Sequence, residues 1–205
     1  MAGYTAIAAV GKSLERLITQ AFLARPPVPS KPTAKALLIR TEDLADGKLT
    51  PLLGDTGLTI LLYRVDYNKT MRAAWSARSE DDGRGHLALD LHYLLTPWAE
   101  NAEHQHFLIG RAMQVLERMP TLSGPLLYEP ALPAGYADEP RHGATDGVQV
   151  LLEEITTEAL MRTFDSLPGD FHLSVPYVAR VVRLDTLPEP VHPPVIDADV
   201  EMRVS

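Results

Sequence analysis

The chain has 205 residues, of which 45% are hydrophobic and 22% charged, a balance that predicts a folded protein with the core of a single domain. Its formal net charge of −8, with 19 scattered Lys and Arg residues, argues against nucleic-acid binding. The absence of cysteine excludes disulfides, thiolate nucleophiles and Cys-ligated zinc. We find no apolar run of about 18 residues and no basic stretch leading into an apolar segment, and therefore expect a cytoplasmic protein without membrane insertion or a secretory signal.

Prolines divide the chain. Thirteen of the 17 lie within residues 26–32, 120–140 and 188–194. Because proline fixes φ and lacks a backbone donor, these regions are predicted to be loops or extended connections.

The first half of the chain predicts one helix and two strands. Apolar residues recur at three-and-four spacing over residues 4–23, which indicates a helix. Residues 35–40 and 57–68 are short apolar runs typical of strands, and the glycines of residues 52–58 predict a turn. The polar residues 69–85 indicate a surface loop.

The second half begins with a strand, residues 87–95, in which leucines alternate with polar residues. Pro97 and Trp98 are expected to end it, and Asn101 is the predicted N-cap of a helix that runs to Met119. Beyond the proline-rich connection we expect three elements: a strand at 147–155, a helix at 156–167 capped by Thr156 or Thr157, and a strand at 171–185.

This order of elements is not a regular βαβ alternation, because two successive strands have no helix between them. We therefore predict an α+β fold with a single mixed, largely antiparallel sheet and helices packed on it. Residues 1–187 form the predicted domain, and residues 188–205 form a Pro-rich C-terminal arm.

An aspartate and three histidines lie close together in the sequence: Asp90, His92, His104 and His106. Asp90 and His92 share one face of the predicted strand, an arrangement that can ligate zinc. His104 and His106 fall at the start of the predicted helix, where residues two apart are separated by roughly 200° and cannot face one ion. The alternatives are a small metal-dependent hydrolase that uses Asp90 and His92, and a scaffold in which both residues face solvent.

Other signals of catalysis are weak. There is no G-x-S-x-G motif, and the glycines of residues 52–58 fit neither a dinucleotide nor a P-loop pattern. Glu153 and Glu154 are neighbours in a predicted strand and should point to opposite faces. We therefore expect no catalytic residues and no cofactor.

Several charged and aromatic residues allow two interpretations. Arg180 and Arg183 either protect an edge strand or form a charged partner surface. Trp75 and Trp98 adjoin predicted loops and are either core anchors or interface anchors. A further alternative is a small-ligand binding domain with a pocket under the loop of residues 69–85.

Four segments, taken in order, resemble the cap or tail-terminator family of contractile injection systems, the family of the Photorhabdus virulence cassettes and the antifeeding prophage. The segments are residues 4–18, 57–68, 87–122 and 173–185, and the most specific pieces are LDLHYLLT (89–96) and VARVVRLD (178–185). The resemblance spans about residues 4–185, nearly the whole chain.

This resemblance implies a tail-terminator-like fold and a structural protein that is not an enzyme. Such proteins form a hexameric ring on the end of the inner tube, stop its polymerisation and hold the last sheath ring. The implied partners are further copies of the chain and the tube and sheath proteins of a phage-tail-like particle assembled in the cytoplasm.

Two features bear on assembly. Pro176 departs from the family pattern and suggests an edge strand or a bulge. Residues 195–204 alternate well enough to add as a strand to another chain, and we expect this tail to order only in the assembly. The expected contacts with subunits, tube or sheath are Arg72, Trp75, Arg78, Arg84, Tyr177, Arg180, Arg183, Val195 and Ile196.

Overall fold

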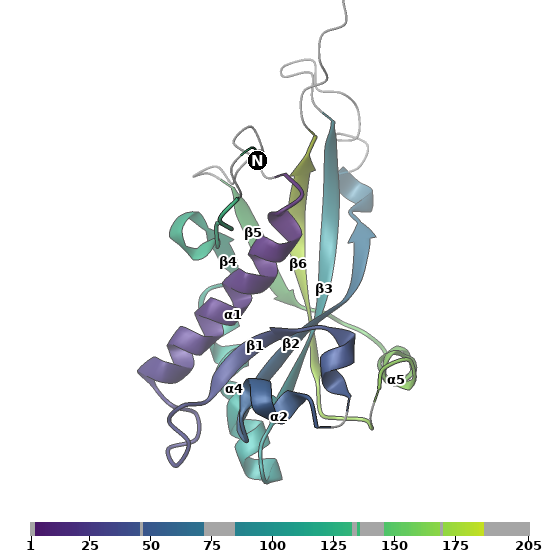
Figure 1. Ribbon diagram of the computed structural model, residues 1–205. Coiled ribbons are helices and arrows are strands. Elements are labelled where there is room, and N and C mark those ends of the chain that lie inside the picture. Colours follow the sequence, from purple (N-terminus) through teal and green to yellow (C-terminus); the bar gives the residue numbers. More distant parts are fainter. Residues whose placement is uncertain are drawn as a thin grey trace, which may run out of the picture.

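The computed structural model describes residues 3–45, 47–71, 85–132, 135, 146–168 and 170–186 (Figure 1). Its helices and strands are α1 (Ala6–Ala24), β1 (Lys35–Ile39), η1 (Thr41–Leu44), α2 (Leu49–Leu53), β2 (Gly57–Tyr67), β3 (His86–Trp98), α4 (Ala102–Arg118), β4 (Thr121–Ser123), η2 (Gly124–Leu126), β5 (Gly147–Leu152), α5 (Thr157–Asp165) and β6 (Val175–Asp185).

One six-stranded sheet forms the centre of the molecule, with strand order β1-β2-β3-β6-β5-β4. β1 is parallel to β2, and all other neighbours are antiparallel. The prediction of an α+β fold with a single mixed, largely antiparallel sheet is therefore confirmed.

Apolar side chains cover both faces of the sheet. On one face, α1 crosses the strands (Figure 1), and its residues join those of α4 and the sheet in the larger core cluster. Tyr93 and Phe22 are among the largest fully buried side chains there. The opposite face carries a smaller cluster formed by Ile39, Leu61 and Leu94 with Phe164 of α5. Because both faces are covered, β3 is buried almost throughout its second half.

The predicted helices form, and their caps agree with the sequence. Asn101 adopts an extended conformation, and its side-chain oxygen accepts the N–H of His104 at 2.8 Å, which satisfies a donor of the first turn of α4. Thr156 caps α5 in the same way, accepting the N–H of Ala159 at 3.2 Å. Gly54, at a φ of 85°, makes the predicted turn before β2.

Several strand boundaries differ from the predictions. β3 continues through Pro97 to Trp98, because Pro97 pairs with Leu58 close to the end of the β2–β3 ladder. β5 ends at Leu152, so Glu153 and Glu154 lie beyond the strand and not within it. The short elements η1, α2, β4 and η2 were not predicted.

Of the edge strand or bulge that Pro176 suggested, the edge strand is wrong, and the register of the β3–β6 ladder shifts between Ala179 and Val182 and not at Pro176. β6 lies between β3 and β5 and pairs with both. Pro176 is tolerated because it is the second residue of the strand and lies beyond the last residue of β5, where its carbonyl still accepts the N–H of Glu153 at 3.0 Å. The interpretation of Arg180 and Arg183 as edge protection is therefore also wrong.

Side chains of α1 cover the outer edge of β1. Glu15 Oε2 accepts the N–H of Leu38 at 2.8 Å, and the Thr19 hydroxyl accepts the N–H of Ala36 at 3.0 Å and donates to its carbonyl at 3.2 Å. Glu15 and Thr19 are one helical turn apart and thus substitute for a further strand along this edge.

Candidate functional site

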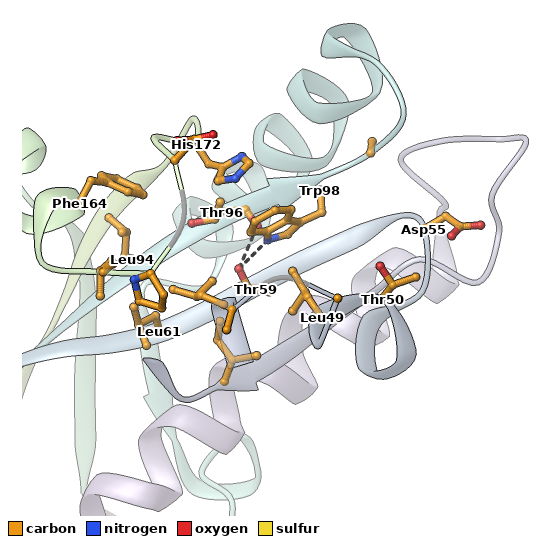
Figure 2. A pocket seen from close by; sticks show the side chains of 18 of the residues that line it. Leu49, Thr50, Asp55, Thr59, Leu61, Leu94, Thr96, Trp98, Phe164 and His172 are labelled. Carbon is orange, nitrogen blue, oxygen red and sulfur yellow. Dashed lines mark hydrogen bonds between the residues drawn. The ribbon is translucent and has the colours of Figure 1, made fainter. Parts of the chain in front are cut away.

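A hollow of about 790 Å³ opens on the sheet face opposite α1 (Figure 2). Its apolar wall is the smaller core cluster, including Leu61, Leu94 and Phe164. The remaining wall is formed by α2, the ends of β2 and β3, and the segment that leads into β6. The hollow is therefore built by segments that are distant in sequence.

Polar groups in this wall are bonded to one another. Trp98 Nε1 donates to the Thr59 hydroxyl at 2.9 Å (Figure 2), and that hydroxyl lies 3.3 Å from the Thr96 carbonyl. The Thr96 and Ser174 hydroxyls are 2.6 Å apart. The indole of Trp98 also packs on His172, with ring centroids 4.2 Å apart. These contacts fix the shape of the wall and engage the hydroxyl groups of Thr59 and Thr96 in structural hydrogen bonds.

The rim of the hollow is acidic, with Asp55, Glu100 and Asp170 at its surface. Lys31 lies 2.9 Å from Glu100, and this hydrogen bond and charge lower the pKa of the Glu100 carboxyl. Trp98 is half-buried against this hollow, so it combines a packing role with partial exposure.

His92 is the centre of a charged cluster on the same face of the sheet. Its Nδ1 lies 2.8 Å from Glu153 Oε1, and its Nε2 lies 3.3 Å from Asp66 Oδ2. Arg64 approaches the same Glu153 oxygen at 3.0 Å, and the Tyr63 hydroxyl donates to the other at 3.1 Å. Burial, together with the nearby Glu153 carboxylate, raises the pKa of Tyr63 to about 12.

The structure does not join Asp90 to this cluster. Asp90 accepts hydrogen bonds from the Asn68 amide at 3.0 and 3.2 Å. His92 is only 7% exposed, so the expectation that it faces solvent is wrong: the β5–α5 connection covers it through Glu153. Among the residues that the structure describes, no group of three or more His, Asp or Glu side chains is arranged to hold a metal ion.

Sequence reasoning missed this cluster because Glu153 and His92 are 61 residues apart and because Glu153 was assigned to a strand. The sequence singled out His92 and Glu153 separately, and nothing in it indicated that the two side chains are partners.

Of the nine expected interface residues, three lie in the described part of the chain and six lie outside it. Tyr177 is buried in the larger core cluster, Arg180 is exposed on β6, and Arg183 Nε lies 2.9 Å from the buried Asp185. Burial raises the pKa of Tyr177. The others lie outside the described residues: Arg72, Trp75, Arg78, Arg84, Val195 and Ile196.

The expected ligand pocket also involves residues outside the described part of the chain. Most of the loop from Lys69 to Gly85 is not described, whereas the hollow of Figure 2 lies towards the opposite end of β3, beside Trp98. Within the described ranges, no helix is both long and apolar enough to cross a bilayer.

Comparison with known structures finds two similar proteins. One is the sheath/tube terminator of an extracellular contractile injection system, PVC, in its extended state: the TM-score is 0.54 and the identity 19%, over 97% of this chain and 64% of that chain. The other is the anti-feeding prophage cap, a tube-terminating cap, with a TM-score of 0.49 and 15% identity over 95% of this chain and 59% of that chain. The chain thus spans less than two thirds of either structure.

The first similarity shows a shared fold, as the resemblance in sequence predicted. No curated protein sequence matches the chain. The sequence profile of one family, described as the Pvc16 N-terminal domain, matches residues 9–198. Since this match covers nearly the whole chain, the chain belongs to the family of the Pvc16 N-terminal domain.

Proposed function

We propose that this chain is the structural cap of a contractile injection system, a protein without catalytic activity that ends the inner tube and anchors the last sheath ring. The observation that carries the proposal is the family match over residues 9–198. The fold shared with a sheath/tube terminator supports it.

In this proposal, copies of the chain form a hexameric ring on the tube end. Tube and sheath proteins of the same particle are the partners, the particle assembles in the cytoplasm, and neither nucleic acid nor a membrane is bound. Residues 1–187 are the terminator-like domain, and residues 188–205 are an arm for contacts in the assembly. The exposed Arg180 on β6 is one candidate contact.

Tube assembly in the presence and absence of the chain tests this function. The inner tube protein of the same particle is polymerised alone and with the full chain, and tube lengths and ends are measured by negative-stain imaging. Shorter tubes with a density at one end are expected, together with a ring mass by light scattering. Unchanged tube lengths with a strictly monomeric chain would reject the proposal.

A further inference from the structure

Parts of both edges of the sheet have no neighbouring strand among the described residues. β1 pairs only with Gly57–Leu61 of β2, whereas β2 continues to Tyr67. Beyond Leu61, no strand of the described residues lies along the outer side of β2. The region Arg64–Tyr67 is exposed.

The backbone of Val65 points towards this open edge. The Asn68 N–H donates to the Ala88 carbonyl at 2.8 Å, which makes Asn68 and Ala88 a hydrogen-bonded pair of the antiparallel ladder. Such pairs alternate along a strand, so Asp66 and Arg64 also bond to β3. The N–H and carbonyl groups of Val65 are therefore directed away from β3.

β4 forms the opposite edge of the sheet. The Val150 N–H donates to the Pro120 carbonyl at 2.7 Å, so by the same alternation Leu122 bonds to β5. Thr121 and Ser123 then direct their N–H and carbonyl groups away from β5. As the N-cap of η2, Ser123 uses its carbonyl as the first acceptor of that helix, whereas no hydrogen bond from the described residues reaches the Ser123 N–H or the N–H and carbonyl of Thr121.

The open edges of β2 and β4 run in the same direction, and the two residues that the inferred contact would pair, Val65 and Leu122, lie within two residues of the same level along the strands. The register of the strands places Pro120, Val150, Ala179, Leu91 and Val65 side by side across the sheet. β4 therefore starts at the level of Val65, in the half of β2 that β1 leaves uncovered. Since four successive antiparallel steps separate β2 from β4, the two strands run in the same direction.

The apolar side chains at the two edges lie on the same face of the sheet. Leu122 belongs to the core cluster on the α1 face of the sheet, and Val65 lies on that face through its pairing with Leu91 of the same cluster. Val65 is 44% exposed. A strand that placed Leu122 beside Val65 would thus cover an apolar side chain that the isolated chain leaves in solvent.

We infer that β4 of one copy pairs in parallel with the Arg64–Asp66 edge of β2 in the next copy. There it takes the position beside the second half of β2 that β1 takes beside the first half. The Val65 N–H then donates to the Thr121 carbonyl, and the Val65 carbonyl accepts the Ser123 N–H. This contact is heterologous, as a closed ring requires, and it is built by strand addition. The inference rests on the proposed cap function, for which it names the contact between subunits. The β1 edge takes no part, because Thr19 bonds to the N–H and carbonyl of Ala36 and Glu15 bonds to the N–H of Leu38.

Cysteine cross-linking tests the contact, because the natural chain contains no cysteine. In the inferred register Asp66 lies beside Ser123 of the next copy, and both side chains are exposed. Within one chain these positions are four strand spacings apart, about 19 Å, whereas a disulfide needs Cα atoms within about 7 Å. The full-length variant Asp66→Cys/Ser123→Cys therefore links only different copies.

The variants are oxidised while assembled with the inner tube protein. The double variant should yield a reducible ladder of linked oligomers, each single variant should stay unlinked, and a mixture of the two single variants should give dimers only. A second double variant, Asp66→Cys/Thr121→Cys, tests a register shifted by two residues. Linked oligomers from this variant would support pairing between the same two edges. Thermal melting of each single variant verifies that it folds.

Two results would overturn the inference. Capped tubes without linked oligomers from either double variant would reject this contact and leave the cap function standing. Linking of the Asp66→Cys single variant to itself would show a symmetric β2–β2 contact instead. Conversely, linked oligomers from a chain that never caps tubes would uphold the contact and reject the function.

Discussion

At the scale of single residues, Tyr93 places a hydroxyl group in the larger core cluster. The side chain is fully buried, and its oxygen has no hydrogen-bond partner among the described residues. Because an unsatisfied buried hydroxyl costs about 1–3 kcal/mol, Tyr93→Phe should raise the free energy of unfolding by about 1 kcal/mol. Thermal melting should show a rise of about 2–4 °C.

Tyr63 provides the matched control, because its hydroxyl donates to Glu153 at 3.1 Å. Tyr63→Phe removes a hydrogen bond to a carboxylate and should lower the free energy of unfolding by about 1 kcal/mol. Equal effects of the two substitutions would contradict the different roles assigned to the hydroxyls.

The same two tyrosines predict a loss of stability at alkaline pH. Burial raises the pKa of Tyr63 to about 12 and also raises the pKa of Tyr93, whereas tyrosine in an unfolded chain titrates near pH 10. A raised folded-state pKa stabilises the fold below about pH 10, and this contribution is lost as the pH rises from there through about 12. Urea midpoints measured across that range should fall, and they should fall less for Tyr93→Phe; an identical pH dependence would contradict this.

His92 is expected to act in packing and not in metal binding. His92→Ala deprives Glu153, whose side chain is 11% exposed, of one partner and should lower the free energy of unfolding by about 1–3 kcal/mol. A chelator should leave the melting temperature of the natural chain unchanged. Stoichiometric zinc or manganese in the purified protein, lost in His92→Ala together with an activity, would support a metalloenzyme instead.

At the scale of elements, the covering of β1 by α1 predicts a specific effect of Glu15. Glu15→Ala leaves the Leu38 N–H without its acceptor, so the free energy of unfolding should fall by about 1–3 kcal/mol and the exposed edge should promote association. Chemical denaturation and light scattering measure the two effects. Glu15→Gln keeps a side-chain carbonyl as acceptor and should show little of either; equal behaviour of both variants would argue against edge covering.

Elements with local signals were predictable from the sequence. The helix α4 formed between its cap Asn101 and Pro120 because both ends are fixed by adjacent residues. β4 has three residues and no pattern of its own, and it exists only because Leu122 enters the core beside Val148. Pro97 was read as a stop, but pairing with β2 overrides that local preference.

At the scale of the whole molecule, the fold class could be predicted but the strand order could not. The insertion of β6 between β3 and β5 depends on contacts between segments far apart in sequence, and no local pattern encodes them. For the same reason the hollow beside Trp98 and the pairing of His92 with Glu153 were not foreseen. The open edges of β2 and β4 likewise become visible only once the register is known.

The proposed division into a domain and a C-terminal arm predicts that removing the arm affects assembly but not folding. β6, which supplies the core residues Ala179 and Val182, ends at Asp185, so a chain shortened to residues 1–187 retains every described strand and helix. Its melting temperature should stay within about 2 °C of that of the full chain, because both described core clusters lie within the residues that it keeps. Its capping of tubes should weaken, because residues 195–204 are expected to order only against other subunits. Hydrogen exchange gives the direct measurement: in the full chain these residues should be unprotected in isolation and protected on tube ends, and equal protection in both states would refute an assembly-dependent arm.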